Sequence, residues 1–314
     1  MPSNDFMIFA GSSNLPLAQK IALKLSIKLG VLELKRFSDG EIWVKYGENI
    51  RGREIFIIQS TNPPSDNVLE LLIMIDAARR ASAKRITAVI PYFGYSRQDR
   101  KDQPRVSITA KLMANLITEA GADRVITMDL HAAQIQGFFD IPFDHLYGSS
   151  IFINHINKLS ENLAVVSPDV GGIKVARAYA KMLHSGLIVI DKRRLSHNQA
   201  EVMQIIGDPA GKDILLVDDL IDTAGTFIGA IKALREKGAK KIFGAVTHPM
   251  LSGHAVEKLD QSELDTLFVT DTIYREENIS NKIKVITASD LFAEALIRTY
   301  NNESISSLFN IDKG

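Results

Sequence analysis

Two adjacent carboxylates follow a short apolar stretch in the second half of the chain. Asp218 and Asp219 come directly after Ile-Leu-Leu-Val at positions 214–217. Carboxylate oxygens accept hydrogen bonds from sugar hydroxyls and bind hard cations such as Mg²⁺. If the apolar stretch is a strand of a parallel sheet, the two acids lie at its carboxyl end, where such sheets bind ligands.

A turn of small residues follows the acids and predicts a phosphate site. Residues 222–226, Asp-Thr-Ala-Gly-Thr, offer consecutive backbone N–H groups, two hydroxyls and the start of a helix. These groups suit a phosphate monoester. A phosphate at one end and a diol at the other describe a pentose 5-phosphate. The alternative is a plain helix N-cap preceded by solvated acids, which is the weaker interpretation because the acids directly follow an apolar run.

The elements that must position these groups alternate between short apolar strands and amphipathic helices. This alternation is typical of βαβ units. We predict an α/β fold with two tandem doubly wound, mostly parallel sheets and right-handed crossovers. The predicted strands are 54–59, 85–90, 124–128, 163–166, 187–190, 214–217, 241–246 and 267–269, and the predicted helices are 67–81, 108–120 (with Gly121 as C-cap), 172–184 and 226–238.

The chain length of 314 residues indicates two domains. Residues 84–91 resemble residues 240–247. Each of these segments is preceded at nearly the same distance by an apolar strand, 54–59 before the first and 213–218 before the second. A diverged duplication explains this echo, although any two βαβ units look somewhat alike. We expect an N-terminal domain over 1–147 and a C-terminal domain over 148–314, with the last ~25 residues packing on either the first or the second domain.

Composition excludes several classes of function. The 37 basic and 37 acidic residues balance, which argues against a nucleic-acid-binding or membrane-surface protein. Cysteine is absent, which removes disulfides, thiolate metal sites and cysteine nucleophiles. The first residues lack the basic segment of a secretory signal, and no apolar run approaches the ~18 residues of a membrane span. We therefore expect a cytoplasmic protein.

The segment from the acids to Thr226 resembles the phosphoribosyl diphosphate-binding loop of the type I phosphoribosyltransferase fold. Ala224 is a departure, since some members carry glycine there, but alanine is small enough to keep the shape of the loop. Further segments resemble the class I ribose-phosphate diphosphokinases over nearly the whole chain. These segments are Phe-Ser-Asp-Gly-Glu at 37–41, Pro-Tyr-Phe-Gly-Tyr-Ser-Arg-Gln-Asp-Arg at 91–100, Asp-Leu-His at 129–131, Ser-Pro-Asp-Val-Gly-Gly at 167–172 and Asp-Lys-Arg-Arg at 191–194.

The resemblance implies that ATP and ribose 5-phosphate give AMP and 5-phosphoribosyl 1-diphosphate. The second product is a precursor for nucleotide biosynthesis. The sugar 1-hydroxyl attacks the β-phosphorus of ATP. No Walker A motif is present, because residues 207–213 have the wrong spacing. The resemblance assigns ATP binding to Phe37, Asp39, Gly40, Glu41, Arg97 and Gln98, and ribose 5-phosphate binding to Arg194, Asp218, Asp219, Asp222, Thr223, Ala224, Gly225 and Thr226.

Metal binding and catalysis are implied for four further residues. His131 and Asp169 match the family's Mg²⁺ ligands, although histidine is an uncommon ligand of a hard cation and could act through water. Lys192 and Arg194 would stabilise the transferring diphosphoryl group from a closing loop that excludes water. Residues 169–172 could hold the pyrophosphate part. Taken alone, a lone histidine or a basic turn is more often structural or solvated.

The resemblance also implies a homohexamer, activation by inorganic phosphate and inhibition by ADP, with 101–105 and 304–309 as candidate effector contacts. Three other functions are considered. A nucleobase phosphoribosyltransferase would explain the loop at 222–226 but not the doubled domain. A non-catalytic regulatory homologue would have lost loop residues that this chain keeps. A Rossmann dehydrogenase would need a Gly-x-Gly-x-x-Gly string after a strand, which the sequence lacks.

Overall fold

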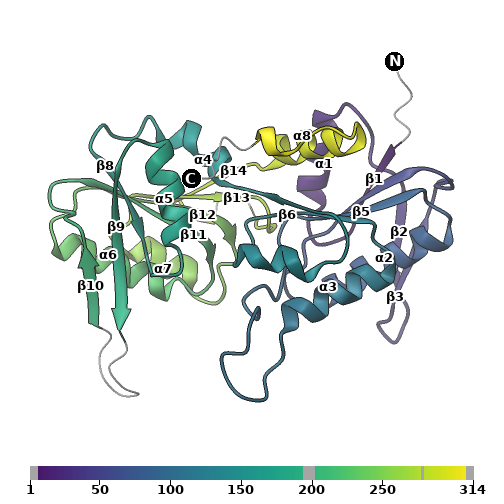
Figure 1. Cartoon of the computed structure of the whole chain (residues 1–314), viewed down its shortest axis with the longest axis horizontal. Helices are drawn as coiled ribbons and strands as arrows, with labels where there is room; N and C mark the ends of the chain where they lie inside the picture. The colour runs from purple at the N-terminus through teal and green to yellow at the C-terminus, as the bar shows by residue number, and fades with distance from the viewer. Residues whose placement is uncertain (1–5, 194–201, 277–278, 309–314) are drawn as a thin grey trace. The chain divides into compact units, whose positions relative to one another are not determined.

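The computed structural model describes residues 6–193, 202–276 and 279–308 (Figure 1). Two compact units make up the chain. The first unit runs to Tyr147 and also takes in residues 272–274 and 287–308. The second unit runs from Gly148 to Asp271 and includes residues 275–286. Residues 287–308 therefore pack with the N-terminal half of the sequence.

The first unit is built on a parallel five-stranded sheet in the order β1-β4-β5-β6-β7. A separate antiparallel hairpin, β2–β3, precedes β4 in the chain. The strands are β1 Phe6–Ala10, β2 Leu32–Arg36, β3 Ile42–Tyr46, β4 Glu54–Ile58, β5 Arg85–Ile90, β6 Arg124–Met128 and β7 Phe143–Leu146. The helices are α1 Leu15–Lys24, α2 Asp66–Arg80, α3 Thr109–Ala120, the 3₁₀ helix η1 Ala133–Phe138, α8 Ser289–Tyr300 and the 3₁₀ helix η2 Ser306–Leu308.

Helices cover both faces of this sheet. On one face, α2 and α3 bury apolar side chains such as Leu71, Ile75 and Ile117 against the strands. On the other, α1 and α8 lie side by side (Figure 1) and the ring of Phe6 contacts Tyr300 of α8. Gly121 ends α3 in the left-handed conformation, so the predicted glycine C-cap is confirmed.

The second unit is built on a seven-stranded sheet in the order β10-β9-β8-β11-β12-β13-β14. Within the described residues of this sheet the β9–β10 pair is antiparallel and every other pair is parallel. The strands are β8 Leu163–Ser167, β9 Gly186–Arg193, β10 Val202–Ile206, β11 Asp213–Ile221, β12 Ile242–Pro249, β13 Thr266–Thr270 and β14 Ile283–Ile286. The helices are α4 Ser149–Ile156, α5 Ile173–Met182, α6 Gly225–Glu236 and α7 Ala255–Gln261, with α4 and α5 on one face and α6 and α7 on the other.

The predicted α/β class with two mostly parallel sheets is confirmed. The largest difference concerns β11, which was expected to end at Val217 and instead continues to Ile221. The reason is pairing: β11 leaves its neighbour β8 after Leu216 but stays in register with β12 as far as Ile221 opposite Pro249. The two acids therefore lie inside a strand, at the point where one neighbour has ended.

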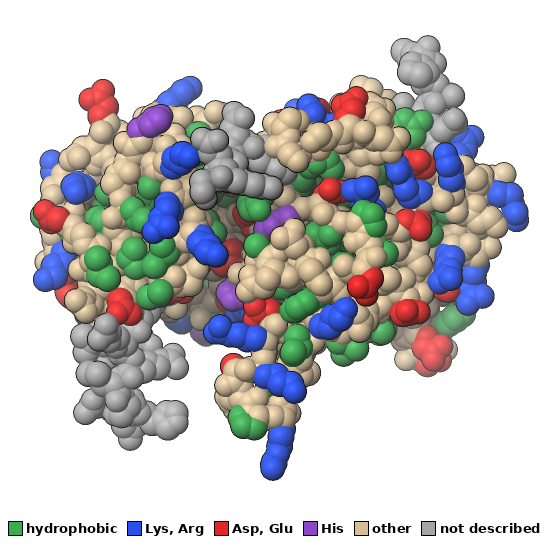
Figure 2. Space-filling model, in the orientation of Figure 1, with side chains coloured by type: hydrophobic (Ala, Val, Ile, Leu, Met, Phe, Trp, Pro, Cys, Tyr) green, Lys and Arg blue, Asp and Glu red, His purple; other side chains and the backbone are tan. Residues whose placement is uncertain are grey.

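Charges of both signs are scattered over the molecular face in Figure 2, which agrees with the balanced composition. In the described ranges, the longest and most apolar helices still fall short of what a membrane crossing requires.

Candidate functional site

Three carboxylates meet at the carboxyl edge of the sheet in the second unit. Asp218 and Asp219 lie on β11, and Asp169 follows the end of the neighbouring strand β8. Desolvation raises the pKa of Asp218 well above its usual range, and the negative charges of Asp219 and Asp169 raise it further. The backbone N–H of Asp219 donates to Asp218 Oδ1 at 2.9 Å. Such a concentration of negative charge favours a cation or a hydroxyl-rich ligand.

The turn after β11 is held from one side by the segment that follows β12. The N–H groups of Leu251 and Ser252 donate to the carbonyls of Ile221 and Asp222, both at 3.0 Å, and Lys258 Nζ lies 3.5 Å from the carbonyl of Thr223. In a trans peptide the N–H points opposite to the carbonyl. The N–H groups of residues 222–224 are therefore directed away from residues 251–258, as an anion-binding loop requires.

Ala224 closes this turn in the left-handed conformation, with φ 61° and ψ 1°. Its methyl group is buried in the core beneath α6, and its carbonyl accepts from the N–H of Ile228. Alanine in this conformation costs ~1–2 kcal/mol relative to the right-handed form. Thr223, Gly225 and Thr226 are exposed.

The turn 169–172 is shaped by its own side chains. Ser167 Oγ donates to the carbonyl of Asp169 at 2.7 Å, and the N–H of Gly172 donates to Asp169 Oδ1 at 2.9 Å. A Cβ on Gly172 would lie 2.9 Å from Ser167 Oγ, so a side chain there would displace the hydroxyl that shapes this turn. Asp169 is half-buried with one carboxylate oxygen, Oδ1, bound to the turn, and carboxylate oxygens of this kind are the ligands that hard cations prefer.

His131 belongs to the first unit and follows the end of β6. Its side chain is exposed. The neighbouring N–H of Leu130 donates to His145 Nε2 at 3.0 Å, and Asp129 has a positive φ of 34°. Among the described residues no set of three His, Asp or Glu side chains, the three acids of the second unit included, is arranged closely enough to enclose a metal ion.

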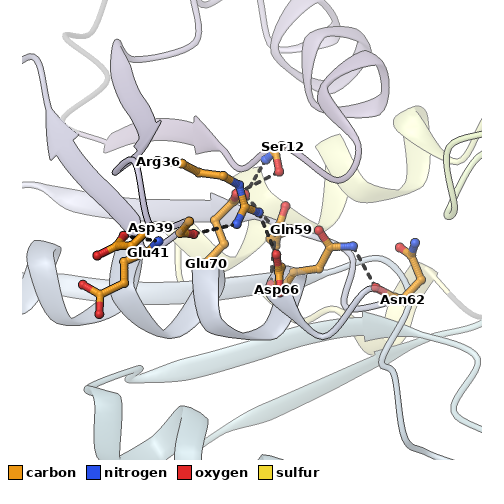
Figure 3. Close-up of polar contacts among 10 residues, drawn as sticks. Ser12, Arg36, Asp39, Glu41, Gln59, Asn62, Asp66 and Glu70 are labelled. Carbon is orange, nitrogen blue, oxygen red and sulfur yellow. Dashed lines mark hydrogen bonds and ion pairs between the residues drawn. The ribbon is translucent and has the colours of Figure 1, made fainter.

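The predicted nucleotide residues occupy two places in the first unit. The tip of the β2–β3 hairpin carries Phe37, Asp39, Gly40 and Glu41, of which Asp39 and Glu41 are labelled in Figure 3, and Phe37 is 55% exposed. An exposed aromatic ring with acids beside it can stack on a base and accept from its amino group.

Arg97 and Gln98 follow β5 and precede α3. Both side chains are exposed, and Gln98 Oε1 accepts from Thr109 Oγ1 at 2.5 Å at the start of α3. The N–H of Gly94 donates to Thr61 Oγ1 at 2.7 Å, which ties this segment to the end of β4. The guanidinium of an arginine such as Arg97 can donate two parallel hydrogen bonds to phosphate oxygens.

Of the predicted catalytic residues, the backbone of Lys192 lies in β9, where it pairs with Met203 of β10. Its side chain and the whole of Arg194 lie outside the described residues.

A buried polar cluster in the first unit was not predicted from the sequence. Glu70 of α2 accepts from the N–H and hydroxyl of Ser12, at 2.5 and 2.8 Å, and from Gln59 Nε2 at 2.8 Å (Figure 3). Gln59 Oε1 accepts from the hydroxyl of Ser13 at 2.6 Å. The signal that could have revealed it is a glutamate among the apolar positions of the predicted helix 67–81. This cluster holds the loop after β1 against α2.

The fold and the site together define an α/β protein of two units, each built on a mostly parallel sheet flanked by helices. A family model described as the N-terminal domain of ribose phosphate pyrophosphokinase matches residues 6–121. A second model, described as a phosphoribosyl synthetase-associated domain, matches residues 193–310.

Individual proteins extend this similarity to nearly the full chain. A ribose-phosphate pyrophosphokinase from Chlorobaculum tepidum is 59% identical over 305 residues, covering 96% of this chain and 94% of the relative. One from Campylobacter jejuni is 54% identical over 306 residues, covering 97% and 99%. The crystal structure of phosphoribosylpyrophosphate synthetase from Mycobacterium smegmatis has a TM-score of 0.90 and 38% identity, covering 95% of this chain and 99% of that one. The chain belongs to the ribose-phosphate pyrophosphokinase family, and the predicted enzyme class is confirmed.

Proposed function

We propose that this chain transfers the diphosphoryl group of ATP to the 1-hydroxyl of ribose 5-phosphate and releases AMP. In this step the sugar O1 forms a bond to the β-phosphorus, the bond from that phosphorus to the α–β bridging oxygen breaks, and the O1 proton passes to solvent or a nearby base. The geometry that carries the proposal is the turn 222–226, whose N–H groups at residues 222–224 face away from residues 251–258 and lie beside the acids of β11. We place the sugar phosphate in the second unit and ATP contacts in the first.

Ribose 5-phosphate would bind with its phosphate on the turn and its diol on the acids. The exposed hydroxyls of Thr223 and Thr226 and the N–H groups at the start of α6 suit the phosphate. The carboxylates of Asp218 and Asp219 suit the ribose hydroxyls as acceptors. Burial and the negative charges of Asp219 and Asp169 raise the pKa of Asp218, and a bound cation or hydroxyl-rich ligand would offset that unfavourable environment of the carboxylate.

ATP would use the hairpin tip and the segment after β5. The exposed Phe37 ring offers a stacking surface for adenine, and Asp39, Gly40 and Glu41 surround it. Arg97 would bind phosphate oxygens, with Gln98 beside it. The support is the exposure of these side chains and their match to the family segments.

Mg²⁺ belongs to the proposal because members of this family generally use it. Asp169 fits a hard cation, since it offers a carboxylate oxygen beside two further acids. His131 is assigned to Mg²⁺ binding on the family match alone. When bound, Mg²⁺ would neutralise phosphate charge as a Lewis acid.

Lys192 and Arg194 complete the proposed machinery. Charge redistributes over the diphosphoryl oxygens during transfer, and fixed cations lower that barrier. Arg194 would also contact the ribose phosphate. A homohexamer, a cytoplasmic location, and effector roles for inorganic phosphate and ADP are carried over from the resemblance as parts of the same proposal.

A crossed pair of variants tests the assignment of the two substrates. Asp222→Ala should raise the KM for ribose 5-phosphate and leave the KM for ATP close to wild type. Phe37→Ala should do the reverse. If Asp222→Ala affects only the KM for ATP, the turn 222–226 does not bind the sugar phosphate.

A further inference from the structure

Arg36 joins the hairpin tip to the start of α2. Its Nη1 donates to the carbonyl of Gly40 at 3.0 Å, and its Nη2 donates to Asp66 Oδ2 at 2.8 Å (Figure 3). Arg36 is the last residue of β2, and Asp66 is the first residue of α2. One guanidinium therefore contacts the tip and the helix at once.

The tip has a defined shape of its own. The N–H of Phe37 donates to the carbonyl of Glu41 and that of Gly40 to the carbonyl of Phe37, both at 2.9 Å. The N–H of Glu41 donates to Asp39 Oδ1 at 3.0 Å, and Gly40 has φ 98°, which favours glycine. These bonds fix the turn internally but do not place it relative to the five-stranded sheet.

The hairpin is anchored to the rest of the first unit at its base. Tyr46, the last residue of β3, donates its hydroxyl to the carbonyl of Met74 in α2 at 2.8 Å, and its ring packs edge-on against Phe9. The β2–β3 hairpin forms a sheet of its own, so backbone pairing with the five-stranded sheet does not hold the far end. The contact from Arg36 to Asp66 supplies an anchor at that end.

We propose that Arg36 and Asp66 form a positioning pair that holds residues 37–41 in the arrangement that accepts ATP. This inference rests on the proposed role of the tip in ATP binding. Neither residue touches the nucleotide in this account. The pair sets the fraction of molecules whose tip is in place before ATP arrives.

The expected effect is a modest one on affinity. The side chains of Arg36 and Asp66 are 52% and 41% exposed, and ion pairs of that exposure have small coupling energies. Apparent affinity falls in proportion to the fraction of binding-competent molecules. Loss of the pair should therefore raise the KM for ATP about fivefold, and leave kcat and the KM for ribose 5-phosphate within about twofold of wild type.

The chain offers a matched control and a built-in probe. Arg80 and Asp76 form another exposed ion pair on α2, also at 2.8 Å, which does not involve the hairpin. Trp43 is the only tryptophan and lies on β3, so its fluorescence reports on the hairpin. The experiment uses the full chain with Arg36→Gln, Asp66→Asn, the double variant, Arg80→Gln and Phe37→Ala. It measures steady-state kinetics, and Trp43 anisotropy with a non-hydrolysable ATP analogue.

Arg36→Gln and Asp66→Asn should each raise the KM for ATP and lower Trp43 anisotropy in the free enzyme. The double variant should be no worse than Arg36→Gln, and Arg80→Gln should behave as wild type. An unchanged KM for ATP in Arg36→Gln, while Phe37→Ala raises it, would overturn the pair but keep the ATP site. An unchanged KM for ATP in Phe37→Ala as well would overturn the assignment of the tip to ATP, and this inference with it.

Discussion

Gly94 has no room for a side chain, and this gives the sharpest structural prediction for the ATP side. A Cβ at this position would lie far inside contact distance of the carbonyl oxygen of Thr61 and 3.0 Å from its carbonyl carbon. The same two residues are joined by the hydrogen bond from Gly94 N to Thr61 Oγ1. Because the obstacle is backbone, it cannot rotate away. Gly94→Ala must therefore move the segment that carries Arg97.

The cost follows from these contacts. Forcing a methyl group into a packed site costs about 1–3 kcal/mol, and a weakened buried hydrogen bond adds about 1 kcal/mol. We expect a loss of about 3 kcal/mol in the free energy of unfolding of the first unit. For domains of about 150–250 residues each kcal/mol lowers Tm by about 2–4 °C, so the expected fall is about 6–12 °C.

The assay is thermal unfolding followed by fluorescence of Trp43, which lies in the same unit as Gly94. The KM for ATP should rise in parallel. Gly137→Ala is the matched control, because a Cβ there meets no heavy atom within 4 Å, and its stability should stay within about 1 kcal/mol of wild type. If Gly94→Ala melts within 2 °C of Gly137→Ala, the close approach of these two segments is wrong, since ~2 °C is the smallest shift expected per kcal/mol.

Three further predictions concern the second unit and the metal. Lys192→Ala should lower kcat by orders of magnitude with little change in the KM for ribose 5-phosphate, because the lost cation acts on the transferring group; an unchanged kcat removes it from catalysis. His131→Ala should raise the Mg²⁺ concentration needed for half-maximal activity. If that concentration does not change, His131 has a structural role instead. Asp218→Asn, without Mg²⁺ or substrates, should be more stable than wild type near neutral pH. The pKa of Asp218 is raised in the folded state, so the folded chain binds more protons than the unfolded chain above about pH 4, and wild-type stability falls as pH rises. In Asp218→Asn the free energy of unfolding should therefore fall less steeply with pH than in wild type, as urea denaturation at several pH values would show. Equal pH dependence in the two proteins would contradict this prediction.

Strands buried on both faces were the elements that the sequence predicted best. The strand 85–90 was predicted with its observed bounds, and 54–59 differs by one residue, because continuous apolar runs are typical of central parallel strands. The hairpin β2–β3 was missed, since its residues are half-exposed and its pattern is polar. Strand β10 was missed as well, so the antiparallel edge next to β9 was not expected.

The site could be predicted in its residue types but not in its contacts. The phosphate turn and the acids were recognised from a contiguous run. The approach of Asp169 to Asp218 depends on β8 and β11 being neighbours, which no local pattern encodes. Similarly, Ser12 and Glu70 are 58 residues apart, and their contact follows from how β1, β4 and α2 pack. The support that segment 249–258 gives to the turn arises only once β12 pairs with β11 past the acids.

The most direct test of the proposed reaction is the product formed from ATP. The enzyme should be assayed with Mg²⁺ and inorganic phosphate, with and without ribose 5-phosphate, and the nucleotides separated. Attack of the sugar 1-hydroxyl on the β-phosphorus predicts AMP that depends on the sugar, one per phosphoribosyl diphosphate, and no ADP. Sugar-dependent ADP in place of AMP would show transfer of a single phosphoryl group and would contradict the account.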